Sequence, residues 1–287
     1  MKFYLPCSDH NYKDINGNTF INGGTVWLDN IARALRHHGH DAELIPLTGD
    51  WNSADAVILQ SEWSGMPNWH EFKGKKICML GHFCSHVYPD PKQAGADLYF
   101  STWSGDVIKN FPHKVHFMPH AYSDLMDDGK SFNGIEIPFA GNTYPLRGES
   151  WIDGIGVEMI KSTHPEKMFG IYRGAKVCPN IHGPFQKNIV STLPSRIANE
   201  EGTMINERFW NVLGADGVLV TDWTPQMAEF FDKEDLIIGE NKEDFQEKIK
   251  YYSKHKQEGL DKLKKVREKI KKEHTYKERV KIILENL

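Results

Sequence analysis

Residues 206–225 read NERFWNVLGADGVLVTDWTP, and this stretch decides the fold. Polar and charged residues at 206–208 precede an amphipathic turn or two. A Gly-Ala-Asp-Gly break follows at 214–217, and an apolar run then ends in Thr221-Asp222. A helix that leads through such a break into a buried strand is typical of α/β domains with parallel sheets. The polar residues at both ends of this unit need an explanation beyond packing.

The same alternation of apolar runs and amphipathic segments extends outward from this stretch. In the segment 23–40, GGTVWLDNIARALRHHGH, residues Trp27, Ile31 and Leu35 recur at helical spacing, and Gly39 stands where a C-terminal capping glycine belongs. Short apolar runs predict strands at 2–6, 42–47, 55–60, 75–82, 96–102 and 114–120, and again at 135–142, 176–183, 217–222 and 235–240. Apolar stripes predict helices over residues 242–287.

The length of the chain predicts two domains. A chain of 287 residues is long for one hydrophobic core and comfortable for two. The polar, glycine-containing segment 124–135 is interpreted as the linker. We therefore expect two Rossmann-like α/β domains, residues 1–130 and 131–287, whose parallel sheets face an interdomain cleft. Because such sheets bind ligands beyond the carboxyl ends of their strands, the residues that follow each strand are the site candidates.

The composition is that of an ordinary soluble globular protein, with 39% hydrophobic and 26% charged residues. No apolar run approaches the ~20 residues of a membrane span, and the N-terminus lacks the apolar core of a signal peptide. The cysteines at 7, 78, 84 and 178 show no paired spacing, which indicates neither a disulfide framework nor a zinc ribbon. These features predict a cytoplasmic protein without a membrane span.

Positive charge is concentrated near the C-terminus. Residues 242–287 contain 15 Lys and Arg against 9 Asp and Glu, a net charge of +6. Since the whole chain carries −4, the remainder carries −10. We interpret the basic end as a solvated helical face, and a surface that attracts a polyanion is the alternative.

In the first half, titratable side chains follow three of the expected strands. Asp9, Glu62 and His82 each carry a carboxylate or an imidazole suited to removing a proton from an acceptor hydroxyl, so each is a candidate catalytic base. The spacing of His82, Cys84 and His86 invites a metal interpretation, but no fourth ligand is apparent. We therefore expect no metal site.

The pair Gly23-Gly24 stands at the start of the first expected helix. Glycine lets a ligand approach the backbone closely, and free N–H groups at a helix start favour anions. A tight turn explains the pair equally well, since the pattern G-x-G-x-x-G of dinucleotide sites is missing. Both glycines are candidates for ligand binding.

In the second half, the residues around the strand ends are mostly cationic, amide-bearing or hydroxyl-bearing. The candidates for ligand binding are Asn142, Arg147, His182, Arg196, Thr203, Asn206, Glu207, Arg208 and Asp222. Guanidinium, amide and hydroxyl groups near a helix start match a diphosphate and its sugar hydroxyls. The alternative is an ordinary N-cap at Asn206 with surface charges around it.

Three ordered blocks carry a resemblance to a known family. They are FAGNTYPLRGES (139–150), NERFWNVLGADGVLVTDWTPQMAEFF (206–231) and EHTYKERVKIILENL (273–287). Together they resemble the C-terminal half of GT-B glycosyltransferases of the spore-protein CgeB type, or glycosyl transferases group 1, from Ile137 onward. The resemblance implies a metal-independent enzyme without a cofactor. Such an enzyme moves a sugar from a nucleotide-sugar donor, bound by the C-terminal domain, to an acceptor hydroxyl on the N-terminal domain.

Carried over by position, the resemblance implies a donor site made of Asn142, Arg196, Thr203, Asn206, Arg208 and Asp222, with His182 nearby. Arg196 and Arg208 would stabilise the charge of the departing diphosphate, with Arg147 in reserve. Relatives often have Glu where this chain has Asn211, and an amide cannot act as an anionic partner.

The sequence is also compatible with other functions. One is a non-catalytic nucleotide-sugar-binding module, which Asn211 favours. Another is a transferase that acts on a modified base in DNA, for which the basic residues 242–287 are the argument. An epimerase or hydrolase of the same architecture would consume the nucleotide sugar without an acceptor. The expected partners are therefore a nucleotide sugar and an acceptor that is a glycan, a small molecule or modified DNA.

Overall fold

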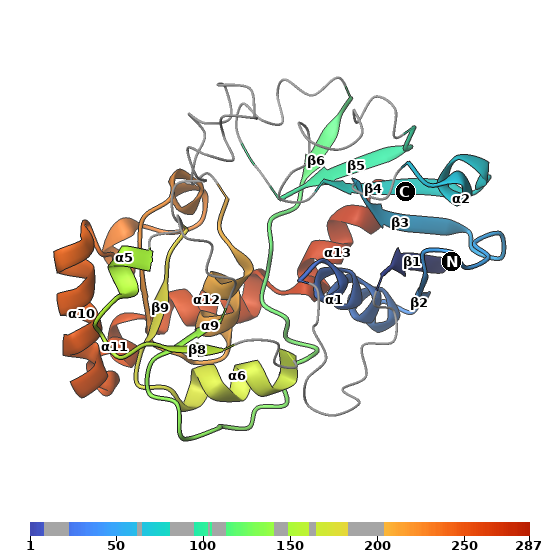
Figure 1. Cartoon of the computed structure of the whole chain (residues 1–287). Coiled ribbons are helices and arrows are strands. Elements are labelled where there is room, and N and C mark those ends of the chain that lie inside the picture. Colours follow the sequence, from blue (N-terminus) through green and yellow to red (C-terminus); the bar gives the residue numbers. More distant parts are fainter. Residues whose placement is uncertain are drawn as a thin grey trace. The chain divides into compact units, whose positions relative to one another are not determined.

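The computed structural model of the chain describes residues 1–8, 23–61, 65–80, 95–102, 104, 113–140, 149–160, 165–182 and 204–287. These residues fold into two compact units (Figure 1). The first unit comprises Met1–Pro119 together with Tyr276–Leu287, and the second comprises His120–Thr275. The chain therefore passes between the units twice.

The first unit is built on a six-stranded parallel sheet with the order β2-β1-β3-β4-β5-β6. Its strands are β1 (Lys2–Cys7), β2 (Asp41–Pro46), β3 (Ala56–Gln60), β4 (Lys75–Leu80), β5 (Leu98–Ser101) and β6 (Val115–Phe117). Strands β1, β3 and β4 are buried along most of their length, as in a parallel sheet covered on both faces. The strand order reverses between β1 and β3, because the chain goes from β1 to β2 on one side and resumes with β3 on the other.

Helices α1 (Gly23–His37) and α13 (Tyr276–Leu284) pack against each other in the first unit, although they come from opposite ends of the sequence (Figure 1). The expected helix at 23–40 is thus confirmed. It ends at His37, and Gly39 beyond that end has a φ of +82°, which suits glycine, and an N–H that donates to the Arg36 carbonyl at 3.0 Å. The short helix α2 (Pro67–Glu71) lies between β3 and β4 in the chain.

The second unit contains two parallel strand pairs. They are β7 (Pro138–Ala140) with β8 (Glu158–Ile160), and β9 (Cys178–Asn180) with β10 (Leu219–Thr221). Strands β7 and β9 also lie against each other. Between successive strands the chain forms α5 (Glu149–Ile152), α6 (Pro165–Gly174) and α9 (Glu207–Gly214). Both units therefore confirm the expected α/β class with parallel sheets.

The stretch that begins at Asn206 folds as its pattern predicts. Asn206 is the N-cap of α9, and its side-chain oxygen accepts the N–H of Phe209 at 3.1 Å. The helix ends at Gly214, where a Cβ would lie 2.2 Å from the ring of Tyr122. Asp216, with φ of 60°, turns the chain into β10. The N-cap, the close packing of Gly214 and the left-handed turn at Asp216 thus define the stretch from α9 to β10 locally.

The remainder of the second unit is helical. It comprises the 3₁₀ turns η2 (Pro225–Glu229) and η3 (Lys233–Asp235) and the helices α10 (Lys242–Lys254), α11 (Lys256–Lys262) and α12 (Lys264–Glu273). Among the helices of the described residues, none combines the length and the apolar character needed to cross a bilayer.

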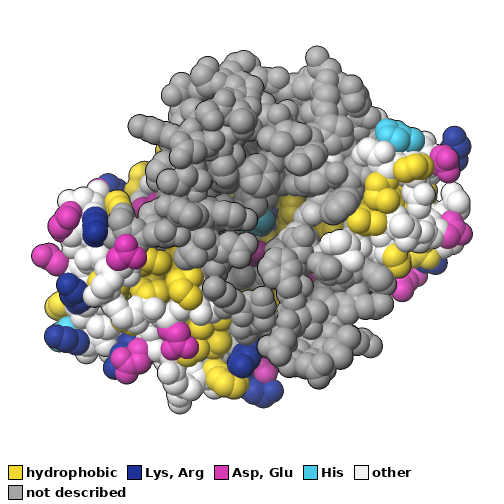
Figure 2. All heavy atoms as spheres, in the orientation of Figure 1, with side chains coloured by type: hydrophobic (Ala, Val, Ile, Leu, Met, Phe, Trp, Pro, Cys, Tyr) yellow, Lys and Arg dark blue, Asp and Glu magenta, His cyan; other side chains and the backbone are white. Residues whose placement is uncertain are grey.

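Many lysines of these helices contact the second unit itself. Their ammonium groups donate to backbone carbonyls in four pairs: Lys248 to Ile238, Lys256 to Arg173, Lys262 to Glu234 and Lys269 to Phe230. On the face shown in Figure 2, basic and acidic side chains are interspersed over the described part of the surface rather than gathered in one basic patch. Four of the 15 cationic residues that the sequence concentrates at 242–287 therefore contact carbonyls of this unit.

Two details of the expected secondary structure are wrong. The segment 235–240 forms no strand, because its only ladder contact is a single bridge between Thr221 and Ile238. Its apolar residues are buried by packing instead. Strand β8 and helix α6 were not expected, since β8 has one buried residue and gives no apolar run, and a short helix leaves little periodic signal.

The division of the chain also differs from the expected boundary near residue 130. The backbone N–H of Tyr122 donates to the His274 carbonyl at 2.9 Å, which fastens the segment after Pro119 within the second unit. Arg279 of α13 donates through Nε to the Pro119 carbonyl at 3.1 Å, within the first unit. The roles expected of the two domains, acceptor side and donor side, stay predictions.

Candidate functional site

Four of the expected site residues meet at the carboxyl ends of β9 and β10 in the second unit: His182, Asn206, Arg208 and Asp222. His182 follows β9 by two residues and Asp222 directly follows β10, while Asn206 and Arg208 stand at the start of α9. Parallel α/β sheets bind ligands at this edge. We call these four residues the carboxyl-end cluster.

His182 and Asp222 form a close pair. Nδ1 of His182 lies 2.7 Å from Oδ1 of Asp222, and the backbone N–H of His182 donates to both carboxylate oxygens, at 2.8 and 3.0 Å. The imidazole is 3% exposed and the carboxylate side chain 17%. The pair therefore joins the ends of β9 and β10, and the carboxylate is its more accessible member.

Arg208 reaches from the first turn of α9 to the ends of two strands. Its Nε donates to the carbonyl of Ala140, the last residue of β7, at 2.6 Å. Its Nη1 donates to Oδ1 of Asn180, the last residue of β9, at 3.1 Å. The guanidinium carbon lies 4.0 Å from the centre of the Phe139 ring. These contacts fix a positive charge at the strand ends before any ligand binds.

Two buried titratable groups lie on neighbouring elements, Tyr172 in α6 and Cys178 in β9. Burial raises the pKa of the Tyr172 hydroxyl, and the positive charge of Arg208 partly opposes this increase. Burial likewise raises the pKa of the Cys178 thiol to about 12. Both side chains are therefore neutral at pH 7 and contribute packing rather than acid–base chemistry.

Asn206 and Glu207 have the local geometry of an ordinary helix start. The side-chain oxygen of Asn206 accepts from Phe209, as described above, and its Nδ2 lies 3.4 Å from the Ile181 carbonyl. Glu207 occupies the first turn of α9, where the helix dipole favours a carboxylate. The N-cap interpretation of Asn206 is thus correct, and a ligand contact by the same residue stays a prediction.

Gly23 and Gly24 lie in the first unit, at the start of α1. A Cβ on Gly24 would lie 2.5 Å from both terminal atoms of the Gln60 side chain. Gln60 is the last residue of β3. The Gln60 amide thus packs directly against the backbone at position 24, whereas ligand binding by the glycine pair stays a prediction.

Seven expected site residues lie outside the described residues: Asp9, Glu62, His82, Asn142, Arg147, Arg196 and Thr203. Cys84 and His86 do as well. Their roles stay predictions. Among the described residues, no group of three or more His, Cys, Asp and Glu side chains is arranged to hold a metal ion. Metal independence also stays a prediction.

Sequence reasoning missed Asn180, whose side chain is fully buried and contacts Arg208, Thr221 and His182. The available signal was a polar residue at the end of an apolar strand. Asn211, noted because relatives often have Glu there, accepts the backbone N–H of Ser123 through Oδ1 at 3.0 Å. Its amide thus has a structural partner within the second unit.

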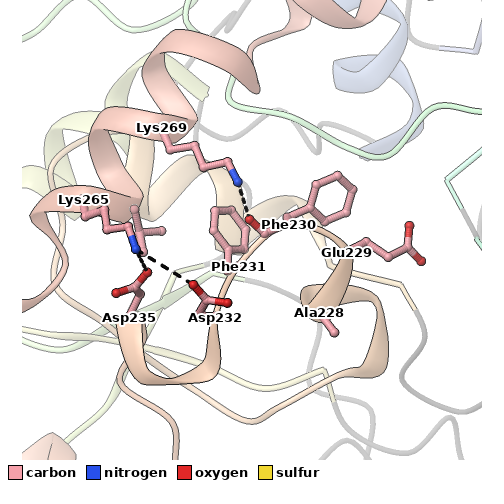
Figure 3. Close-up of a pocket in the computed structure, with 9 residues that line it drawn as sticks. Ala228, Glu229, Phe230, Phe231, Asp232, Asp235, Lys265 and Lys269 are labelled. Carbon is pink, nitrogen blue, oxygen red and sulfur yellow. Dashed lines mark hydrogen bonds and ion pairs between the residues drawn. The ribbon is translucent and has the colours of Figure 1, made fainter.

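A separate pocket of about 220 Å³ lies beside η2 and α12 (Figure 3). Its lining consists of Ala228, Glu229, Phe230, Phe231, Asp232, Asp235, Lys265, Val266 and Lys269. Lys265 pairs with Asp235 at 2.5 Å, and Lys269 donates to the Phe230 carbonyl at 2.6 Å. Both lysines of the pocket therefore have protein partners, and no residue of the carboxyl-end cluster lines it.

The carboxyl-end cluster lies within a segment that identifies the family. The sequence model of the family described as "Glycosyl transferase-like" matches residues 123–285, which is more than half of the chain. The chain belongs to this glycosyl transferase-like family. No curated protein sequence matches it significantly.

Solved structures share the fold over the whole chain. One is an alpha-glucosyltransferase in complex with UDP and a 13-mer DNA containing an HMU base, with 11% identity, a TM-score of 0.63 and 99% of each chain covered. A second is T4 phage BGT in complex with UDP and Mn²⁺, with 10% identity, a TM-score of 0.58 and coverage of 100% of this chain and 99% of that one. A third is sucrose-phosphate synthase from Thermosynechococcus elongatus, with 9% identity, a TM-score of 0.58 and coverage of 99% and 97%.

At these identities the likeness establishes the fold, which is that of GT-B glycosyltransferases. The expected GT-B architecture is thus confirmed, and the family match confirms the expected glycosyltransferase class. The narrower CgeB type stays a prediction.

Proposed function

We propose that this protein transfers a sugar from a nucleotide-sugar donor to an acceptor hydroxyl, and that the donor binds at the carboxyl-end cluster. The observation that carries the proposal is the convergence of Arg208, His182, Asp222 and Asn206 at one sheet edge inside the family segment. The solved structures with UDP bound support UDP-sugars as the first donors to test.

Arg208 is the group that we assign to the leaving diphosphate. Negative charge grows on that diphosphate as the bond to the sugar breaks, so a cation already fixed in place stabilises the transition state without reorganising. The contacts of Arg208 with Ala140, Asn180 and Phe139 hold it in this way. Arg196, or Arg147 as the second choice, would add positive charge at the same step.

Asp222 is the group that we assign to the hydroxyls of the donor. Its carboxylate is held by two N–H groups of His182 and keeps part of its surface accessible. An ionised carboxylate accepts hydrogen bonds only, which suits the hydroxyls of a ribose or a sugar. The proton of the acceptor hydroxyl would go to one of the candidate bases in the first half, Asp9, Glu62 or His82.

The test incubates the protein with UDP-, GDP-, ADP- and TDP-sugars and measures nucleotide release with and without acceptors. We expect release with at least one donor, and release that increases with an acceptor. No turnover with any donor, together with binding detected by thermal shift, would support the non-catalytic binding module instead. Release that is independent of an acceptor, with a free sugar or an epimer as the product, would support a hydrolase or an epimerase.

A variant tests the assignment of Arg208. We expect Arg208→Ala to lower kcat by about 10²-fold, the usual effect of removing one charge-stabilising group. Lys272→Ala, at a side chain that is 80% exposed, serves as the control and should leave kcat unchanged. Thermal denaturation of both variants separates a loss of catalysis from a loss of folding. An Arg208→Ala protein that folds and turns over like the parent would overturn the assignment.

The acceptor has one specific alternative, a modified base in DNA, because one structure of this fold contains DNA with an HMU base. Against it, basic and acidic side chains are interspersed on the described part of the face shown in Figure 2. Glycosylation of HMU-containing duplex DNA, with binding that weakens steeply as salt increases, would favour this acceptor. Glycosylation of small sugars alone would exclude it.

We further propose that transfer needs no metal ion. The same assay with a chelator tests this point, and Mn²⁺ is the ion to add back because it accompanies UDP in T4 phage BGT. Unchanged turnover with the chelator is the expected result. Activity that is lost with the chelator and restored by Mn²⁺ would overturn the proposal.

A further inference from the structure

We infer that Asn180 is a positioning residue of the donor site: its amide holds the Arg208 guanidinium and, together with the Asp222 carboxylate, sets the tautomer of His182. The inference about the amide rests on geometry alone, whereas its effect on sugar transfer rests on the proposed function. Asn180 is the last residue of β9, and its side chain is fully buried. Buried amides need every donor and acceptor to be matched, so their orientation is defined by their neighbours.

The contact with Arg208 determines the orientation of the Asn180 amide. Nη1 of Arg208 lies 3.1 Å from Oδ1 of Asn180. A guanidinium has only donors, so the atom that faces it has to be an acceptor. The oxygen of the amide therefore points to Arg208, and the NH₂ group points the other way.

The neighbours of His182 determine which nitrogen of its imidazole carries the proton. The Asn180 NH₂ group donates to the hydroxyl oxygen of Thr221 at 3.0 Å, and it lies 3.4 Å from Nε2 of His182. Because an NH₂ group only donates, Nε2 has to accept, and the imidazole proton is on Nδ1. That Nδ1–H donates to Asp222 at 2.7 Å. Every donor in this series of hydrogen bonds thus faces an acceptor.

The series runs in one direction, from a cation to an anion. Arg208 donates to Asn180, Asn180 donates to His182, and His182 donates to Asp222. Hydrogen bonds in such a chain polarise one another in a water-poor interior. Asn180 and His182 therefore connect Arg208 and Asp222, the two charged residues that we assign to the donor. The position of the Arg208 side chain thus depends on the position of the Asp222 side chain.

The substitution Asn180→Asp reverses one link while keeping the size of the side chain. A carboxylate still accepts from Arg208, but its second oxygen faces His182 with an acceptor in place of a donor. Nε2 of His182 then has to carry a proton, in addition to the proton on Nδ1 that faces Asp222. The control is Asn241→Asp, the same chemical change at the N-cap of α10, where an Asp oxygen caps as well as an Asn oxygen.

Imidazole ¹⁵N NMR spectra measure the tautomer directly and need no ligand or turnover. We expect the parent to show His182 protonated on Nδ1 only, with the signal identified by its loss in His182→Gln. In Asn180→Asp we expect a proton on Nε2, and in Asn241→Asp the parent spectrum. A parent with its proton on Nε2, or an unchanged His182 signal in a folded Asn180→Asp protein, would overturn the inference. If Asn180→Asp does not fold, a parent spectrum with the His182 proton on Nε2 still overturns the inference.

Kinetics test the positioning role once a donor is known. We expect Asn180→Asp to lower kcat at least tenfold while Asn241→Asp leaves it unchanged, with melting temperatures to confirm folding. Parent kcat in an Asn180→Asp protein whose His182 carries a proton on Nε2 would overturn the positioning role and leave the proposed function intact. An enzyme without turnover on any donor would instead contradict the proposed function, and the tautomer result would still stand.

Discussion

The carboxylate of Asp127 and the guanidinium of Arg173 form an ion pair in the second unit, with side chains that are 3% and 17% exposed. The hydroxyl of Tyr122 donates to the same carboxylate. Arg173 also donates to the Lys130 carbonyl at 2.6 Å. The segment 120–130, which follows the first passage between the units, is thereby fastened to α6. The linker was expected at 124–135, yet the part of it up to residue 130 is packed within the second unit.

Two adjacent aspartates test how much this ion pair contributes. We expect Asp127→Asn to lower the free energy of unfolding by about 3–5 kcal/mol, because it leaves a largely buried guanidinium without its anion. Asp128→Asn should change it by less than about 1 kcal/mol, since Asp128 pairs with a lysine that is 81% exposed. Urea denaturation measures both. Equal effects of the two substitutions on the free energy of unfolding would show that the buried ion pair contributes no more than the exposed one.

A glycine of α9 tests the packing behind the cluster. We expect Gly214→Ala to destabilise the protein by about 1–3 kcal/mol, because its Cβ would lie 2.2 Å from the Tyr122 ring. Gly65→Ala is the control, since a Cβ there meets no atom within 4 Å. Thermal denaturation compares the two variants. A Gly214→Ala protein as stable as the Gly65→Ala protein would show that Tyr122 moves without cost.

Substitutions of Asn206 separate its capping role from a ligand contact. We expect Asn206→Ala to cost about 1 kcal/mol of stability and Asn206→Asp to cost little, because Asp caps a helix as well as Asn does. Urea denaturation measures this term, and nucleotide affinity is measured on the same proteins. If Asn206→Asp keeps its stability and loses affinity, the residue also contacts the donor. If both are kept, its role is the cap alone.

The thiol of Cys178 predicts a pH dependence. Burial raises its pKa from 9.0 to about 12, so the folded protein keeps the thiol neutral where an unfolded chain loses the proton. This contribution of Cys178 to stability is therefore complete below pH 9, and it is lost as the pH rises towards about 12. Cys178→Ser should flatten the fall of the unfolding free energy over that range. An equally steep fall in the variant would contradict the assignment.

Reagent accessibility gives an independent measure of the same thiol. We expect iodoacetamide at pH 7.5 to modify Cys178 far more slowly in the native protein than in urea, where its thiolate and its surface are both available. Mass spectrometry of the peptide that contains Cys178 follows the reaction. Rapid native modification would indicate that β9 opens frequently.

Local sequence signals predicted the helices and strands whose pattern is strong. Gly39 closes α1, Asn206 caps α9, and the apolar runs of the first half became the six-stranded sheet. The weak signals failed: β8 has one buried residue, Ile160, and the apolar run at 235–240 is buried with only a single bridge to Thr221. Short apolar runs are ambiguous because burial alone, without a ladder, satisfies their hydrophobicity.

The sequence by itself determined the α/β class, the family and the residues around the strand ends, because these depend on local pattern and residue chemistry. Only the tertiary structure decided what those residues contact. It placed Asn180 between Arg208 and His182, and it turned several C-terminal lysines towards carbonyls of their own unit. The physical reason is that hydrogen bonds depend on distances between atoms far apart in the chain, and spacing along the sequence does not specify those distances.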